Sequence, residues 1–419
     1  MRAPHEPARM VLLSAARSLP TNLPLHSFTA PPERTIVTIE DTNTIAKATP
    51  TRTIRGAVLE AIGAERPYAD TRPIHVENLE LEGPGKGEIL VRIEAAGVCH
   101  SDLSVVNGNR PRPVPMLLGH EAAGIVEELG EGVNDISLGQ RVVMTFLPRC
   151  GECAGCNSNG KTPCEQGSAS NTEGTLLGGN RRLSREGQPV QHHLGVSAFA
   201  THAVVSRRSV VPVGSDVPAH IAALLGCALL TGGGAILNVA KPAPSARVAI
   251  VGLGGVGMAA LITAIATGVE HVVGIDTLPA KLEAARNLGA ADALTSADAL
   301  ERGEKFDAVI EAAGHPRALE AAIALTRPGG ITVTVGLPAP GQSVSIDPLT
   351  LTAEARSIVG SYLGSAVPEH DIPIYERLWR SGQLAVEGLV SDTIRLEEIN
   401  RAMDTLEGGH ALRQIITFS

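Results

Sequence analysis

The stretch Val248-Ala-Ile-Val-Gly252-Leu-Gly254-Gly255-Val-Gly257 decides the fold. It begins as a short β-branched run, passes through a G-x-G-x-x-G pattern and continues as an apolar helical run to Thr267. Asp276 ends the next predicted strand. In such a strand–turn–helix unit the glycines let the backbone turn and approach a pyrophosphate, while the carboxylate binds a ribose 2′-hydroxyl. Dinucleotide binding is therefore predicted, with Gly252, Gly254, Gly255 and Gly257 at the phosphates.

Asp276 also indicates which dinucleotide is bound. A carboxylate at that position bonds the 2′-hydroxyl and repels a 2′-phosphate, so NAD is favoured over NADP. The alternative is that the glycines serve only close packing and that Asp276 only caps a helix.

The residues downstream of this turn alternate between strand and helix patterns. Arg247–Gly252, His271–Asp276, Phe306–Glu311 and Gly330–Gly336 are predicted strands, and Leu278–Leu288 and Arg317–Thr326 are predicted helices. Strands that alternate with helices of this length predict an α/β fold with a doubly wound parallel sheet.

The region upstream has a different rhythm. Between Gly56 and Val213, short β-like runs are separated by Gly and Pro, as in a β-rich domain with long loops; the runs include Ile89–Ile93, Gly124–Glu128 and Arg141–Met144. At the other end of the chain, two helices and a final strand are predicted, at Ile372–Ser381, Leu396–Gly408 and Leu412–Phe418. Residues 1–53 are rich in Pro, Thr, Ser and Ala and are predicted to be a disordered extension.

Composition excludes several classes of protein. The chain has 419 residues, 43% of them hydrophobic, and a net charge of −9, which argues against a disordered chain and a nucleic-acid binder. Ile221–Ala240 and Val248–Val269 are apolar enough to resemble membrane spans, but glycines interrupt both. A soluble, cytoplasmic protein without nucleic-acid or membrane partners is expected.

Four of the six cysteines form a C-x2-C-x2-C-x7-C pattern: Cys150, Cys153, Cys156 and Cys164. Four thiolates so close in sequence suit one tetrahedral ion in a closed, structural zinc site. Two disulfides are one alternative, but a cytosolic chain argues against them. An iron–sulfur cluster is the other, but its usual cysteine spacings differ from this one.

The other two cysteines, Cys99 and Cys227, are interpreted through a resemblance. The motifs Gly97-Val-Cys-His-Ser-Asp102 and Gly119-His-Glu-Ala-Ala-Gly124, with the cysteine loop and the glycine turn, resemble the zinc-dependent alcohol dehydrogenases of the medium-chain dehydrogenase/reductase family. The resemblance extends from about Arg55 to Phe418. It implies a GroES-like β-rich catalytic domain over residues 54–228 and 363–419, and a Rossmann domain over residues 229–362.

The resemblance also implies the catalytic centre. It makes Cys99, His120 and Cys227 the ligands of a second, catalytic zinc that would lower the pKa of an alcohol. Ser101 would receive the alcohol proton and Asp102 would orient His120. Glu121 matches an acid that approaches the metal while ligands exchange.

Further positions are implied for the cofactor and the substrate. The resemblance places five more residues at the cofactor: His100, Thr231, Val256, Lys281 and Arg413. It places Phe146, His193 and Leu194 in the substrate pocket, with Arg110 near its mouth. Three positions depart from the best-known pattern: Ser104 stands where a relay histidine is common, His100 where an arginine is common, and His193 where an aromatic ring is common.

The expected function is reversible, NAD-dependent oxidation of an alcohol to an aldehyde or ketone, with two zinc ions per chain. Oxidation of formaldehyde as a thiol adduct is the alternative within the same fold. A non-catalytic zinc- and nucleotide-binding relative is the alternative from another class, but it would lack one of the three zinc ligands. The resemblance implies a homodimer or homotetramer.

Overall fold

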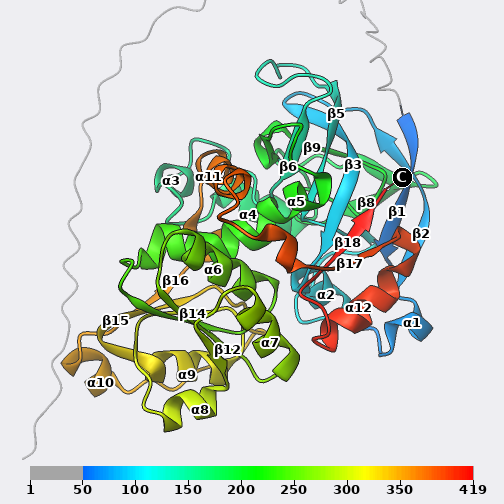
Figure 1. The fold of residues 1–419 in the computed structure, drawn as a ribbon. Helices are drawn as coiled ribbons and strands as arrows, with labels where there is room; N and C mark the ends of the chain where they lie inside the picture. The colour runs from blue at the N-terminus through cyan, green and yellow to red at the C-terminus, as the bar shows by residue number, and fades with distance from the viewer. Residues whose placement is uncertain (1–50, 419) are drawn as a thin grey trace, which may run out of the picture. The chain divides into compact units, whose positions relative to one another are not determined.

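The computed structural model describes residues 51–418 (Figure 1). Most of the predicted disordered extension lies outside these residues. Residues 51–53 do not belong to it, because they form the start of β1 (Thr51–Leu59), which pairs antiparallel with β2 (Ile74–Glu82). The strand β1 therefore includes three residues that were predicted to belong to the extension.

The parallel sheet predicted from the glycine turn is present. Its six strands are all parallel, in the order β13-β12-β11-β14-β15-β16. In chain order they are β11 (Arg247–Val251), β12 (His271–Ile275), β13 (Asp292–Leu294), β14 (Phe306–Glu311), β15 (Thr326–Thr334) and β16 (Ser357–Gly360). This is the 3-2-1-4-5-6 order of doubly wound dinucleotide-binding sheets, whose ligands lie where the order reverses, beside β11.

Helices connect these strands, as Figure 1 shows for α6, α7, α8 and α9. They are α6 (Gly255–Ala266), α7 (Pro279–Asn287), α8 (Ser296–Glu301), α9 (Pro316–Leu325) and α10 (Pro348–Ala353). The strands β11, β12 and β14 are almost entirely buried, as expected for a sheet covered on both faces.

The upstream region is β-rich, as predicted. One group of strands closes as β1-β2-β7-β8-β4, and a second sheet has the order β10-β6-β5-β3-β18-β17 with β9 also on β3. The remaining strands are β3 (Glu88–Val98), β4 (Met116–Leu117), β5 (Ala122–Leu129), β6 (Arg141–Met144), β7 (Leu183–Arg185), β8 (Gln188–His192), β9 (His202–Ser206) and β10 (Val210–Pro212).

The C-terminal segment returns to this second sheet. The strand β18 (Arg413–Thr417) pairs antiparallel with β3 and parallel with β17 (Val390–Ile394). Two helices precede it, α11 (Pro368–Arg380) and α12 (Ile399–Glu407). The helix α11 begins four residues before the predicted Ile372, at a proline, which suits the first helical position because its missing N–H would have no partner there.

One expectation was wrong. Gly232, Gly233 and Gly234 do not interrupt the apolar stretch, which is a helical run, Ala219–Ala240, composed of α5 (Ala219–Leu224), η2 (Leu225–Gly233) and η3 (Ala235–Ala240). The glycines allow close packing instead. A Cβ on Gly232 would lie 2.1 Å from the carbonyl oxygen of Val256 in α6.

This run is, among residues 51–418, the one helix long and apolar enough to cross a membrane. However, 83% of its most apolar window is buried inside the protein. It therefore has the burial expected of a core helix. The run crosses the predicted domain boundary at 228/229, so that boundary falls inside a helix.

Candidate functional site

Cys99, His120 and Cys227 converge in the protein interior from three different elements. Cys99 caps the N-terminus of α2 (His100–Val106), His120 follows β4, and Cys227 lies in η2. All three are buried, and the Cys227 Sγ lies 3.4 Å from the His120 Nε2. Together with a carboxylate oxygen of Glu121, their potential ligand atoms all lie within 4.8 Å of one another. This spacing fits one metal ion.

Asp102 fixes the orientation of His120. Its Oδ1 lies 3.1 Å from the His120 Nδ1 and accepts the backbone N–H of Gly119 at 3.1 Å, while its Oδ2 accepts the N–H of Cys99 at 3.2 Å. Because Nδ1 faces the carboxylate, Nε2 is the ring nitrogen available beside the two thiols. An imidazole held by a carboxylate in this way is the usual arrangement behind a metal ligand.

The electrostatics of the cluster favour a cation. A hydrogen bond from Cys227, with the nearby Arg413 and His120, holds the pKa of the Cys99 thiol well below its usual value. Although burial alone would raise the pKa of Asp102, His120 and His193 lower it, so the carboxylate is ionised. A thiolate and a carboxylate in a buried site are strong ligands and orienting groups for a divalent ion.

Glu121 and Arg413 form a buried ion pair that sequence reasoning missed. The Arg413 Nε lies 3.3 Å from the Glu121 Oε2, and another guanidinium nitrogen donates to the Cys99 Sγ at 3.5 Å. Burial raises the pKa of Glu121 to about 7, although Arg413 opposes that shift. Arg413 is the first residue of β18, some 290 positions from Glu121 in sequence, so no local pattern indicates the pair.

The four-cysteine loop is compact. The Sγ atoms of Cys150 and Cys156 are 3.8 Å apart, those of Cys153 and Cys164 are 3.9 Å apart, and all four lie within 4.8 Å of one another. Tetrahedral sulfurs at about 2.3 Å from zinc would be about 3.8 Å apart. A disulfide needs about 2.05 Å, and all four cysteines are free.

Backbone N–H groups point at these sulfurs and support their thiolate form. Gly151 donates to the Cys156 Sγ at 3.3 Å, and Gly167 donates to the Cys164 Sγ at 3.3 Å. Backbone hydrogen bonds lower the pKa of Cys153 to about 6, whereas burial raises the pKa of Cys156 to about 12 and also raises that of Cys164. The backbone N–H groups therefore favour negative charge on sulfur, and burial opposes it at Cys156 and Cys164.

The glycine turn has the close contacts that its pattern predicts. Gly252 has a positive φ of 90°, and a Cβ on Gly257 would lie 1.8 Å from the Gly252 carbonyl oxygen. A Cβ on Gly254 would meet nothing within 4 Å, so space is open beside the N-terminus of α6. A Cβ on Gly255 would meet the Arg413 guanidinium at 2.3 Å, which brings that arginine to the same helix terminus.

Asp276 lies at the end of β12, beside this turn. Its Oδ2 accepts the N–H of Leu253 at 2.7 Å, and Lys281 places its Nζ 3.9 Å away. Its Oδ1 accepts the N–H groups of Thr277 and Leu278. The structure thus brings together the carboxylate, the lysine and the glycines that sequence reasoning assigned to the dinucleotide.

The three predicted pocket residues lie around the cluster and are buried. The rings of Phe146 and His193 each contact the His120 ring edge to face, with centroids 5.6 Å apart. The His193 Nδ1 also lies 3.1 Å from the Asp102 Oδ1, a contact that sequence reasoning did not predict. Leu194, the third residue, is buried in the same hydrophobic core as Phe146.

Tyr362 is a site residue that sequence reasoning missed. Its ring contacts Phe146 edge to face at 5.8 Å, and the residue is 38% exposed. It follows β16, so it reaches the cluster from the parallel sheet. No motif surrounds it, and no signal in the sequence could have identified it.

The remaining predicted residues lie near the cluster or the turn. The Ser101 Oγ is 4.0 Å from the Cys99 Sγ, whereas the Ser104 Oγ donates to the Ser101 carbonyl at 2.9 Å. His100 is exposed at the start of α2, and Thr231 and Val256 are partly buried, in η2 and α6 respectively.

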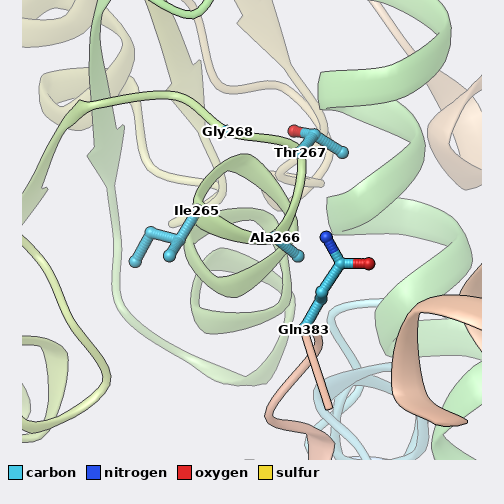
Figure 2. A pocket seen from close by; sticks show the side chains of 5 residues that line it. All are labelled: Ile265, Ala266, Thr267, Gly268 and Gln383. Carbon is cyan, nitrogen blue, oxygen red and sulfur yellow. The ribbon is translucent and has the colours of Figure 1, made fainter. Parts of the chain in front are cut away.

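A solvent-open hollow elsewhere has no comparable chemistry. Figure 2 shows its lining, which consists of Ile265, Ala266, Thr267, Gly268 and Gln383. It is at the C-terminal end of α6, whereas the glycine turn is at the N-terminal end, about 16 Å away along a twelve-residue helix. It has no titratable side chain, and we assign it no function.

Comparison with known proteins identifies the family. Residues 85–215 match the alcohol dehydrogenase GroES-like domain, and residues 255–379 match the zinc-binding dehydrogenase domain. The putative alcohol dehydrogenase D of Mycobacterium tuberculosis is 36% identical over 355 residues, covering 82% of this chain and 96% of that protein.

Solved structures agree with this result. An alcohol dehydrogenase zinc-binding domain protein from Burkholderia ambifaria is 31% identical with a TM-score of 0.82, and the benzyl alcohol dehydrogenase from Acinetobacter calcoaceticus is 30% identical with a TM-score of 0.80. Each match covers 88% of this chain and 100% of the other. With its GroES-like and doubly wound sheets, the chain belongs to the zinc-type medium-chain dehydrogenase/reductase family, as an alcohol dehydrogenase-type oxidoreductase.

Proposed function

We propose that the protein oxidises an alcohol to an aldehyde or ketone, reversibly, with NAD and a zinc ion held by Cys99, His120 and Cys227. The observation that carries this proposal is the convergence of two buried thiols and a carboxylate-held imidazole, with Arg413 extending from that cluster to the glycine turn. One residue thus touches both the candidate metal site and the candidate cofactor site.

The residues fit both groups. Two cysteines and one histidine form the donor set of a catalytic zinc with an open fourth position, and the cysteine loop suits a second, structural zinc. The open space at Gly254 and the N-terminus of α6 suit a pyrophosphate. When bound, zinc would lower the pKa of the alcohol hydroxyl, and NAD would accept a hydride from the carbon that bears that hydroxyl.

The chain's own side chains have distinct tasks in this reaction. Asp102 keeps the His120 Nε2 directed at the cluster. The Ser101 hydroxyl, 4.0 Å from the Cys99 Sγ, is placed to take the proton of the alcohol. The Ser104 hydroxyl donates to a backbone carbonyl oxygen of α2. The proposed proton route from Ser101 therefore does not use Ser104.

Asp276 supports NAD rather than NADP. Its carboxylate lies at the end of β12, where a dinucleotide ribose binds in such sheets, and it would repel a 2′-phosphate. Lys281, 3.9 Å away, suits the ribose hydroxyls. His100, Thr231 and Val256 are proposed as further cofactor contacts because they lie beside the cluster and the turn.

The substrate pocket is proposed to include Phe146, His193 and Leu194. The buried Phe146 and Leu194 suit an apolar part of the alcohol. The structural relative from Acinetobacter calcoaceticus is named for benzyl alcohol, which is consistent with an aromatic substrate here. The thiol-adduct reaction has no support among the relatives described above.

We propose a homodimer or homotetramer in a reducing, cytoplasmic compartment. The edge strand β16 is largely exposed, and Leu349 in the preceding helix α10 is 74% exposed, so a second copy would cover apolar surface there. All six cysteines are free, as a reducing compartment requires. Sedimentation equilibrium tests the oligomer, and a monomer would contradict it.

The experiment that tests the proposed reaction follows NADH formation by absorbance across alcohols of graded size. Zinc-loaded protein should form NADH with NAD, and chelation followed by zinc addition should abolish and restore that activity. Activity that survives complete removal of zinc would refute the proposal.

A further inference from the structure

Two arginines, Arg110 and Arg112, lie in the segment that links α2 to β4. The Arg110 N–H donates to the Ser104 carbonyl oxygen at 2.7 Å, which holds the start of the segment against α2. The segment then runs beside β8, where the Gln191 N–H donates to the Pro115 carbonyl oxygen at 2.9 Å. The Arg-Pro-Arg sequence therefore lies between α2, which Cys99 caps, and β4, which pairs with β8, the strand that leads into His193.

Neither guanidinium has an anionic partner in the described part of the chain. Both arginines are partly buried, yet residues 51–418 provide no ion pair or side-chain hydrogen bond to either. Arg182 and Arg185, also in the β-rich region, each pair with two glutamates. Because partial burial of an unpaired cation is unfavourable, two such arginines together suit an anion from outside the chain.

These charges act on Tyr362, an aromatic residue near the cysteine–histidine cluster. Burial raises the pKa of the Tyr362 phenol, and the charges of Arg112 and Arg110 act against that shift. Arg112 is thus within electrostatic range of Tyr362, whose ring contacts Phe146.

A continuous set of rings leads from the cluster to Tyr362. His120 contacts Phe146 at 5.6 Å between centroids, and Phe146 contacts Tyr362 at 5.8 Å. The Tyr362 hydroxyl has no hydrogen bond among the described residues, so it is available to a ligand. A series of aromatic rings thus extends from the cysteine–histidine cluster to Tyr362, on which the charges of Arg112 and Arg110 act.

We infer that Arg112, with Arg110, binds a carboxylate on the alcohol substrate while the substrate's hydroxyl lies at the Cys99–His120–Cys227 cluster. The part between the two groups packs on Phe146 and Tyr362. A planar guanidinium suits a carboxylate because it can donate two parallel hydrogen bonds. This inference rests on the proposed alcohol oxidation and names its substrate class, an aromatic alcohol with an anionic group.

The test compares 4-(hydroxymethyl)benzoate with its methyl ester, a neutral molecule of similar shape, using NAD and zinc-loaded protein. Wild type should have the higher kcat/KM for the carboxylate. R112Q should lower the carboxylate-to-ester ratio about tenfold, the scale of one charge-assisted hydrogen bond. R110Q should lower it less. Raising the salt concentration should also reduce the wild-type ratio, since part of the attraction is screened.

R377Q is the matched control. Arg377 is exposed on α11 and has no ion pair among the described residues, so its substitution changes the net charge equally without affecting the ratio. If wild type oxidises both alcohols with a ratio that R112Q leaves unchanged, the inference is overturned while alcohol oxidation stands.

A binding measurement distinguishes failure of this inference from failure of the proposed reaction. If wild type oxidises neither alcohol, alcohol oxidation of this class fails, and calorimetry with benzoate then decides on the arginines. Weaker benzoate binding by R112Q than by R377Q would support the anion site. Equal binding by the two variants would overturn it.

Discussion

Replacing Asp102 with asparagine should weaken zinc at the cysteine–histidine cluster and leave the zinc of the four-cysteine loop unchanged. The carboxylate accepts hydrogen bonds from the N–H groups of Cys99 and Gly119 and from the His120 ring nitrogen, at 3.2, 3.1 and 3.1 Å, and the His193 Nδ1 is a further contact at 3.1 Å. An amide has one acceptor oxygen. If that oxygen still accepts the hydrogen bonds of His120 and Gly119, the amide NH2 faces the Cys99 N–H, and two donors then lie opposite each other.

The magnitude follows from these contacts. Hydrogen bonds to a charged group contribute about 1.5–3 kcal/mol and neutral ones about 0.5–1.5 kcal/mol, so replacing three charged bonds by two neutral ones gives a gross loss of about 4–5 kcal/mol. The variant no longer buries a charge, which offsets part of that loss, and we expect the free energy of unfolding to fall by about 1–2 kcal/mol. Affinity for the cluster zinc should fall about 10- to 100-fold, as for other groups that orient a metal ligand.

Competition with a coloured chelator measures both zinc ions in one titration, so the loop zinc is an internal control. Asp392→Asn is the matched control, because Asp392 is exposed and the substitution also replaces a carboxylate with an amide. If Asp102→Asn released its cluster zinc at the same chelator concentration as wild type, the proposed orienting role of Asp102 would be refuted.

Three further predictions concern the cofactor turn and pH. Asp276→Gly should raise the NADP-to-NAD ratio of kcat/KM at least about tenfold, because the charge that repels a 2′-phosphate is lost; an unchanged ratio would count against its ribose role. Gly257→Ala should lower the thermal midpoint because its Cβ would lie 1.8 Å from the Gly252 oxygen, whereas Gly254→Ala, with nothing within 4 Å, should not; equal midpoints would contradict this packing. Burial lowers the pKa of His192 to about 3 in the folded protein. As pH falls below about 6.5, His192 therefore gains a proton in the unfolded chain but stays neutral in the folded one. Between pH 8 and pH 5, chemical unfolding should show wild type losing about 2 kcal/mol more stability than His192→Gln, and equal losses would contradict a neutral, buried His192.

Much of the fold was predictable because its signals are local. The predicted strand ranges Arg141–Met144 and Phe306–Glu311 coincide with β6 and β14. The glycine turn was also recognisable because its whole pattern lies within six consecutive residues, and Gly257 meets the Gly252 carbonyl oxygen inside it. The cysteine loop is likewise contained within fifteen residues.

The unpredicted features depend on contacts between distant residues. The glycines of the apolar stretch were interpreted as breaks, because only the folded chain shows that α6 packs against Gly232. The Glu121–Arg413 pair needs β18 to return beside β3. Tyr362 reaches Phe146 from the end of the parallel sheet. The family resemblance assigns roles to single positions and does not say which residues contact each other, so it gave no indication of this contact.

The most direct test of the central claim is the zinc content of Cys227→Ser, measured on the same samples as NADH formation. Wild type should contain about two zinc ions per chain, and Cys227→Ser should contain about one and form no NADH. Cys227→Ser protein that kept both zinc ions and formed NADH at the wild-type rate would contradict the assignment of a catalytic metal to this cluster.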